Sequence, residues 1–234
     1  MKSDNFIEIS FNAENIDIYI IRTSILKAIK NSLPSLHGKL LDIGCGKMPY
    51  RKFILENSTV NKYVGLDIEN ALAYDENVKP DFTWDGITMP FEDSEFNCAL
   101  GTEVLEHCFE PGIILKEVYR VLKPGGVFFF TVPFLWNLHE VPHDEYRYTP
   151  FALEKHLKNA GFSEVEIKAT GGWDASLAQM IGLWTKRRPL TKTKRKLISM
   201  AVLPVIKFLL KKDNPPVSFR NRDMITGLKG IAKK

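Results

Sequence analysis

Two glycines and two acids stand where strand-like segments end, and their types suit the binding of a small ligand. The run LLDIGCGKMPY at residues 40–50 is a strand pattern that ends in Asp42 and continues into Gly44 and Gly46. Glycines at such a turn let the backbone approach a ligand closely. A second acid, Asp67, ends the strand-like run YVGLD, at the place where a carboxylate holds a ribose diol in nucleotide-binding sheets. We therefore expect one ligand site at the ends of the first two strands.

A dinucleotide is one ligand that this pattern could hold, and two residues argue against it. The dinucleotide fingerprint G-x-G-x-x-G needs a third glycine at the position of Pro49. A carboxylate at Asp42 would repel a pyrophosphate, whereas the sulfonium and ammonium groups of S-adenosylmethionine would tolerate it. The alternative without a ligand is that Asp42 caps the following turn and that Asp67 is a solvated loop acid. We expect S-adenosylmethionine as the ligand.

A second group of polar residues could act on an acceptor. Residues 138–149, LHEVPHDEYRYT, are dense in polar and aromatic side chains for a loop that precedes a helix pattern. His139 and His143 in this stretch, and His107 before it, are candidates for removing a proton from an acceptor hydroxyl. For His107 the alternative is a capping or packing role beneath the cofactor. We expect residues 138–149 to form the wall of the acceptor site, at the edge where doubly wound sheets bind ligands.

Two other interpretations of this wall concern a salt bridge and a metal ion. The wall could be a surface loop in which Asp144 and Arg147 pair with each other. His139 and His143 stand four residues apart, which would suit a metal ion if the segment were helical. Because Pro142 lies between them, we expect no metal site.

The elements that must position these residues alternate between strand and helix patterns from residue 38 to residue 169, as in a parallel sheet covered by helices. One helix is expected over residues 111–122. Another is expected over residues 150–160, with Thr149 as its N-cap and Gly161 after its last turn. Strands are expected at residues 39–43, 63–68, 81–84, 96–101, 127–132 and 163–169.

Residues 173–222 break this alternation, and residues 224–232 return to a strand pattern. The expected fold is α/β, a Rossmann-like, doubly wound, mostly parallel sheet flanked by helices, with a helical insertion before a last antiparallel strand. We expect a single domain over residues 1–234. Its parts are an N-terminal helical cap at 1–37, a cofactor-binding core at 38–170, a basic helical insertion at 171–222 and the final strand at 223–234.

Composition bounds the class of protein. A chain of 234 residues with 44% hydrophobic content can bury a full core, and its length favours one domain. The cysteines at positions 45, 98 and 108 have no paired spacing, and the N-terminus does not follow the pattern of a signal peptide. A cytoplasmic location is therefore expected.

Charge is distributed unevenly along the chain. Residues 186–234 hold 15 Lys and Arg against Asp213 and Asp223, whereas the remainder is acidic. Residues 197–210 are apolar between basic ends and fall short of the roughly 20 residues that span a bilayer. Two interpretations stay open: residues 186–212 contact anionic lipid at the inner membrane face, or they form helices that pack on the domain. Few aromatic residues are interleaved with these charges, so nucleic acid is not the expected partner.

Motifs along residues 38–170 resemble, in order, those of the class I methyltransferases, in particular their small-molecule type. They are LLDIGCG, VGLDIE, WDGITMPFEDSEFNCALGTEVLEH, VLKPGGVFFFTVP and the GF before the sixth strand. The resemblance implies that S-adenosylmethionine lies with its methionine part at residues 42–46 and its adenine near Asp85, and that residues 101–106 line it beneath the methyl group. The cofactor-binding residues expected on this basis are Asp42, Gly44, Cys45, Gly46, Asp67, Ile68, Asp85, Gly86, Thr102 and Glu103.

Simpler interpretations exist for some of these positions. Asp85 could serve only the Asp-Gly turn that it begins. Cys45 could be a small residue that fits a crowded loop. The family often has a third glycine where this chain has Lys47, followed by Met48 and Pro49.

The resemblance implies transfer of a methyl group to a small or lipid-linked polar acceptor, such as a hydroxyl of a sugar or a related metabolite. The alternative is a non-catalytic, cofactor-binding regulatory module associated with the membrane surface. Cofactor binding is expected in both cases, and turnover separates them.

Overall fold

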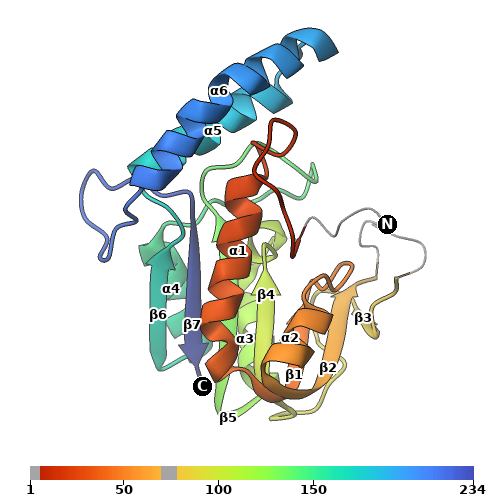
Figure 1. The fold of residues 1–234 in the computed structure, drawn as a ribbon. Helices are drawn as coiled ribbons and strands as arrows, with labels where there is room; N and C mark the ends of the chain where they lie inside the picture. Colours follow the sequence, from red (N-terminus) through yellow and green to blue (C-terminus); the bar gives the residue numbers. More distant parts are fainter. Residues whose placement is uncertain (1–5, 70–77) are drawn as a thin grey trace.

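Residues 6–69 and 78–234, which the computed structural model describes, form a seven-stranded sheet with helices on both faces (Figure 1). The strand order is β3-β2-β1-β4-β5-β7-β6, and β7 runs antiparallel to both of its neighbours. The strands are β1 His37–Ile43, β2 Thr59–Ile68, β3 Phe82–Trp84, β4 Phe96–Thr102, β5 Leu122–Pro133, β6 Glu164–Ala169 and β7 Gly227–Lys233. The predicted doubly wound, mostly parallel sheet with a last antiparallel strand is confirmed.

The central strands are apolar on both faces because helices cover both sides of the sheet. Successive residues of β5 alternate between the two cores, so Phe128 and Phe130 pack on one face and Phe129 on the other. The same alternation separates Leu41 from Leu40 on β1. Each core thereby receives every second side chain of the buried strands.

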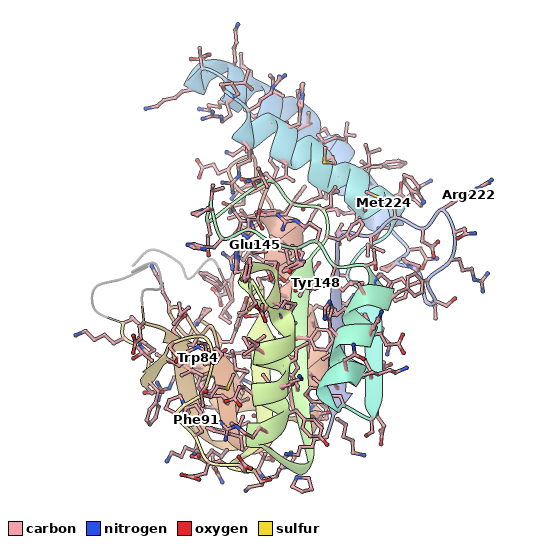
Figure 2. All side chains as sticks on the ribbon, turned by 180° about the vertical axis from the view of Figure 1, so that it is seen from behind. Trp84, Phe91, Glu145, Tyr148, Arg222 and Met224 are labelled. Carbon is pink, nitrogen blue, oxygen red and sulfur yellow. The ribbon has the colours of Figure 1, made fainter. Side chains whose placement is uncertain are left out.

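The helices form two layers. Helices α1 Tyr19–Ser32 and α2 Arg51–Asn57 cover one face, and α3 Pro111–Val121 and α4 Pro150–Ala160 cover the other, which Figure 2 shows from behind. The helix α1, expected as part of an N-terminal cap, lies along one face of the sheet. There it packs against β5 and β7.

Local signals set the ends of α4 as expected. Thr149 accepts a hydrogen bond on its hydroxyl from the N–H of Ala152 at 3.2 Å, and Pro150 occupies the first turn. Gly161 ends the helix in the left-handed conformation with φ of 113°. The preceding helix, α3, ends one residue before its predicted end because Leu122 already belongs to β5.

The insertion between β6 and β7 is a helical hairpin, α5 Trp173–Arg187 and α6 Lys192–Lys212. It projects beyond the carboxyl edge of the sheet (Figure 1). A small apolar core joins it to the N-terminal segment, and its buried members are Ile16, Ile20, Ala178, Ile206 and Leu209. Among the described residues, no helix combines the length and the apolar character that crossing a membrane requires.

Candidate active site

The loop after β1 brings the predicted glycines and the second acid together. Gly44 and Gly46 have positive φ angles of 61° and 49°. A Cβ atom on Gly44 would lie 2.6 Å from Cγ2 of Val104, so the loop packs too closely against the segment after β4 for a side chain. The Gly46 N–H donates to Oδ2 of Asp67 at 2.9 Å. The ends of β1 and β2 therefore form one structural unit.

Asp67 keeps acceptor capacity for a ligand. Its Oδ1 accepts from the N–H of Ile68 at 2.9 Å, so each carboxylate oxygen has one backbone donor. A carboxylate oxygen can accept two hydrogen bonds, which leaves room for hydroxyl donors such as those of a ribose. Burial raises the pKa of this carboxyl above its ordinary value. Ile68 itself is 47% exposed and presents an apolar side chain beside the carboxylate.

Asp42 lies beneath the loop. Its side chain is 3% exposed and accepts a hydrogen bond from the Tyr63 hydroxyl at 2.6 Å. Burial raises the pKa of Asp42 to about 7. The carboxyl group thus ties β1 to β2 from within, and its partner Tyr63 is a residue that sequence reasoning missed.

The turn after β3 carries the two residues expected near the adenine. Oδ1 of Asp85 accepts from the N–H groups of Ile87 at 2.8 Å and Thr88 at 3.0 Å, and these hydrogen bonds lower the pKa of the acid. The Asp85 carboxylate therefore stabilises the turn that this residue begins. A Cβ atom on Gly86 would lie 3.5 Å from Cδ1 of Ile68, which places this turn next to the end of β2.

Cys45 is buried, and burial raises the pKa of its thiol, so the side chain stays neutral inside the loop. Its N–H donates to the carbonyl of Leu66 at 3.1 Å, which fixes the loop against β2. The arrangement agrees with a small residue in a crowded loop.

The end of β4 lies at the same carboxyl edge of the sheet as the ends of β1 and β2. Thr102 is the last residue of the strand, and Glu103 turns the chain with φ of 56° while its N–H donates to Thr131 at 3.0 Å. Burial raises the pKa of Glu103 to about 7. The short 3-10 helix η2, Leu105–His107, follows immediately.

The loop from β5 to α4 is fastened to η2 by its backbone. The N–H groups of Glu145 and Tyr146 donate to the carbonyl of Glu106 at 2.9 and 3.1 Å. Arg147 donates to both oxygens of Asp144, at 2.6 and 2.8 Å. The predicted pair forms, but the Asp144 side chain is only 2% exposed, so it organises the loop from inside. Although burial acts to raise the pKa of Asp144, the hydrogen bond from Arg147 and its other partners hold it at about 2.

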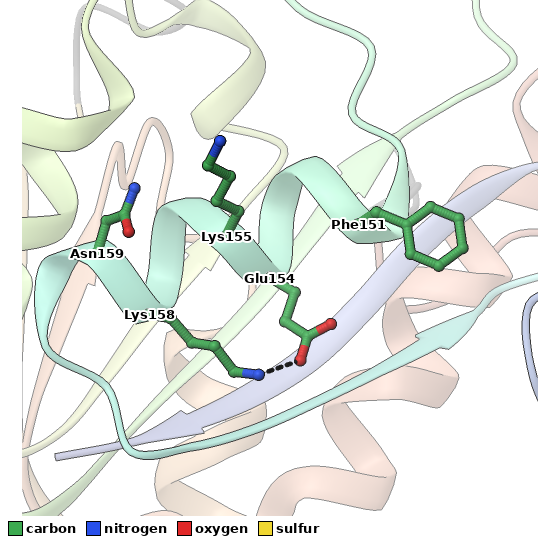
Figure 3. A pocket seen from close by; sticks show the side chains of 5 residues that line it. All are labelled: Phe151, Glu154, Lys155, Lys158 and Asn159. Atoms are coloured by element: carbon green, nitrogen blue, oxygen red, sulfur yellow. Dashed lines mark hydrogen bonds and ion pairs between the residues drawn. The ribbon is translucent and has the colours of Figure 1, made fainter.

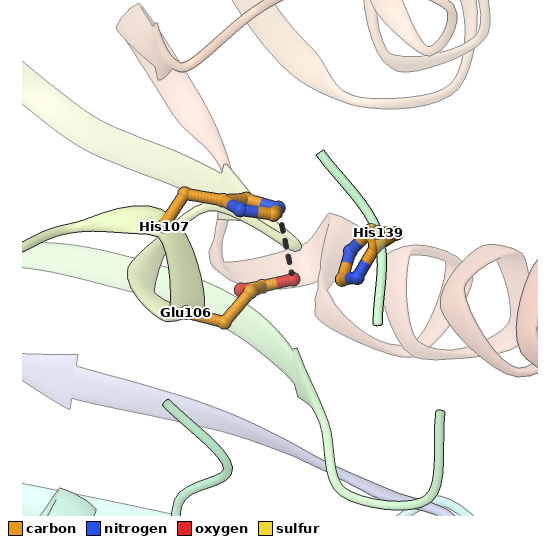
Figure 4. Close-up of side chains that lie close together, drawn as sticks. All are labelled: Glu106, His107 and His139. Atoms are coloured by element: carbon orange, nitrogen blue, oxygen red, sulfur yellow. Dashed lines mark ion pairs between the residues drawn. The ribbon is translucent and has the colours of Figure 1, made fainter. Parts of the chain in front are cut away.

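Two of the three candidate histidines meet in space. The ring centroids of His107 and His139 lie 4.8 Å apart, and Nε2 of His107 lies 3.8 Å from Oε1 of Glu106 (Figure 4). His143 is exposed and contributes its backbone carbonyl, which accepts from Nδ1 of His107 at 2.8 Å. Desolvation lowers the pKa of His139, which favours its neutral form.

Glu106 is a buried acid at the end of the expected cofactor-lining range 101–106, and sequence reasoning gave it no role of its own. Its side chain is 0% exposed, and within residues 6–69 and 78–234 neither carboxylate oxygen has a hydrogen-bond partner. Burial, reinforced by the nearby carboxyl of Glu103, raises its pKa well above the ordinary value. The available signal was the acid beside a histidine in the run EVLEH, directly after a buried strand.

A shallow depression elsewhere on the surface lies along α4 and carries no predicted site residue. Within it, Nζ of Lys158 lies 2.5 Å from Oε1 of Glu154, an exposed pair one helical turn apart (Figure 3). The remaining lining residues are Phe151, Lys155 and Asn159.

Known proteins match both the sequence and the fold. Residues 41–130 match the family described as "Methyltransferase domain". The chain is 36% identical over 104 residues to the sterol 24-C-methyltransferase erg6 of Aspergillus fumigatus, a match that covers 38% of the chain and 26% of that protein. It is 28% identical over 219 residues to the ubiquinone/menaquinone biosynthesis C-methyltransferase UbiE of Bartonella tribocorum, which covers 70% of the chain and 83% of that protein. The chain spans less than half the length of several curated relatives that it matches.

A solved structure extends the likeness to the whole chain. The SAM-dependent methyltransferase from Archaeoglobus fulgidus superposes with a TM-score of 0.57 at 17% identity, over 94% of this chain and 97% of that one. At this identity the likeness concerns the fold. The family match, the strand order and the glycine loop agree with one another. Residues 41–130 therefore carry a methyltransferase domain, on the fold of the S-adenosylmethionine-dependent methyltransferases.

Proposed function

We propose that this protein transfers the methyl group of S-adenosylmethionine to a hydroxyl of a small or lipid-linked polar acceptor, such as a sugar or a related metabolite. The observation that carries this proposal is the meeting of two sets of residues at one sheet edge. Asp67 and Gly46 define the cofactor side, while Glu106, His107 and His139 stand after β4 and in the loop after β5. A module that only binds the cofactor has no need of the second set.

The reaction is an in-line displacement. The acceptor oxygen attacks the methyl carbon, the bond from that carbon to sulfur breaks, and S-adenosylhomocysteine leaves. Alignment of the two reactants supplies much of the acceleration. The hydroxyl must also lose its proton, and His107 and His139 mark the place where we propose that this happens.

The decisive experiment uses S-adenosylmethionine labelled in its methyl group, incubated with the purified protein and fractions of a cell extract. We expect label in a polar or lipid-linked pool, and less label with His139→Ala. His143→Ala is the matched control, because that side chain is exposed and its backbone carbonyl is retained. Calorimetry should show S-adenosylhomocysteine binding in the micromolar range and no binding of NAD. Cofactor binding without labelling of any pool would instead favour the non-catalytic module.

We also propose that the hairpin binds the inner face of the membrane and brings a lipid-linked acceptor to the site. Residues 173–213 contain ten Lys and Arg against two Asp, which favours anionic lipid headgroups. Two relatives named for sterol and for ubiquinone/menaquinone methylation favour the lipid-linked form of this acceptor. Large apolar side chains are exposed on both helices: Trp173, Leu177, Met180 and Trp184 on α5, and Leu197, Met200, Val205 and Phe208 on α6.

The exposed apolar residues of α5 follow the spacing of one helical face, four, three and four residues apart. Such a stripe beside basic residues is the pattern of a helix that lies in the membrane interface. The opposite side of α5 supplies Ala178 to the small core with α6 and the N-terminal segment. The hairpin thus packs on itself while leaving an apolar face for lipid.

A further inference from the structure

Three side chains with metal-binding atoms converge beside the cofactor edge. Glu106 and His107 belong to η2 after β4, and His139 comes from the loop after β5 (Figure 4). One ligand atom from each of the three lies within 4.8 Å of the others. Ligand atoms that share a metal ion at about 2.0–2.2 Å stand roughly 3–4 Å apart, so small side-chain rotations bring these atoms into range.

The Glu106 carboxylate has no hydrogen-bond partner in the described parts of the chain, and Nε2 of His107 lies 3.8 Å from its Oε1. The backbone carbonyl of Glu106 is fixed by the N–H groups of Glu145 and Tyr146. Its side chain is fully buried. An ionised carboxylate is costly to bury unless it is paired or binds a metal. A cation between this carboxylate and the two imidazoles would supply the missing partner.

The His107 imidazole is oriented as metal ligands usually are. A backbone carbonyl only accepts hydrogen bonds, so the contact of 2.8 Å from Nδ1 of His107 to the His143 oxygen places the hydrogen on Nδ1. The lone pair then resides on Nε2, the atom 3.8 Å from Oε1 of Glu106. Nδ1 of His139 lies 3.2 Å from Oδ2 of Asp144, within ion-pair distance but without hydrogen-bond geometry. Metal-bound histidines commonly direct their other ring nitrogen to a carbonyl or a carboxylate.

We propose that Glu106, His107 and His139 bind one divalent transition-metal ion at the acceptor side of the cofactor edge. Imidazole nitrogen together with carboxylate oxygen suits Mn²⁺, Fe²⁺ or Zn²⁺, and three protein ligands leave open coordination positions. The role of the ion rests on the proposed function: an open position receives the acceptor hydroxyl. Coordination promotes loss of the hydroxyl proton to water, and the metal-held oxygen then attacks the methyl carbon while its bond to sulfur breaks. His107 and His139 act in this scheme as ligands.

The test is metal binding to the untagged full chain after treatment with a chelator. Mn²⁺ is titrated with free Mn²⁺ followed by electron paramagnetic resonance, and Zn²⁺ is titrated in a parallel competition series. We expect one site per chain. Glu106→Gln and His139→Ala should each weaken binding at least about tenfold, a loss of about 1.4 kcal/mol. His143→Ala should bind like the wild type, because it keeps the carbonyl that orients His107.

Folding and cofactor binding separate this inference from the proposed function. Circular dichroism checks that each variant is folded, and S-adenosylhomocysteine binding by calorimetry should be retained in all of them. A wild-type chain that binds neither ion at one site, or variants that bind as tightly as the wild type, would overturn the metal site. Failure of S-adenosylhomocysteine to bind would count against the proposed function and leave the metal measurement interpretable.

Discussion

Asp67 connects the two strand ends that form the cofactor edge. Its carboxylate accepts the N–H of Gly46 from the loop after β1 and the N–H of Ile68 from its own strand end. The same group is therefore a structural tie, and we propose that it also accepts a hydroxyl of the cofactor.

Replacing Asp67 with alanine should weaken the binding of S-adenosylhomocysteine by about 1 to 3 kcal/mol, the scale of hydrogen bonds to a charged group. Isothermal titration calorimetry measures the change. Asp93→Ala is the control, since this acid is exposed and pairs with Arg120 on the surface. Unchanged affinity in Asp67→Ala would mean that the ribose lies elsewhere.

The residues of the glycine loop were predictable, and their partners were not. Acids and glycines at strand ends identify an edge because parallel strands end together. A single sequence does not reveal that the Asp42 carboxyl meets Tyr63, or that Met48, and not Lys47, takes the positive φ, here 49°. The role of Glu106 could not be predicted by itself because it depends on the proximity of His139. That histidine lies in the loop after β5 and reaches η2 only in the folded chain.

Elements with explicit end signals were predicted best. Thr149, Pro150 and Gly161 gave both ends of α4 correctly. Strand ends depend on pairing with a neighbour that the local sequence does not contain, so β5 begins at Leu122, which pairs with Phe96, and not at the predicted residue 127.

Thr149→Ala should lower the free energy of unfolding by about 1 kcal/mol, because the first turn of α4 loses its side-chain acceptor. Urea denaturation measures this loss. Thr149→Ser is the matched variant and should keep most of the stability, since its hydroxyl can accept the same bond. Equal destabilisation by serine and alanine would show that the methyl group of Thr149, and not its oxygen, matters.

At the scale of the whole molecule, the basic hairpin has one face that packs against the N-terminal segment and one face that is exposed. The motif-bearing core could be predicted because each motif is local. The interpretation of residues 186–212 stayed open because a pattern of apolar and basic residues does not say which face packs on the domain. The structure packs Ile206 and Leu209 inward and leaves Phe208 exposed.

Trp184→Glu on α5 and Phe208→Glu on α6 should each lower binding to vesicles of mixed neutral and anionic phosphatidyl lipids about tenfold or more. Burying one large apolar side chain is worth about 1.5–3 kcal/mol, and an acid also repels the anionic surface. Vesicle sedimentation measures the bound fraction, which should fall with rising salt. Phe109→Glu, an exposed phenylalanine outside the hairpin, is the control. Equal binding by all three variants would exclude the hairpin as the lipid-binding surface.

The position of β7 has a consequence for the order in which the chain folds. Among the described strands, β6 pairs only with β7, and β7 is also the partner of β5 on its far side. During synthesis, β6 leaves the ribosome long before residues 227–233, because the whole hairpin is made in between. Until then the nascent chain exposes two unpaired strand edges, which are sites of aggregation. The hairpin can fold during this time, because its contacts are local. The sheet is completed last, when β7 inserts between β5 and β6.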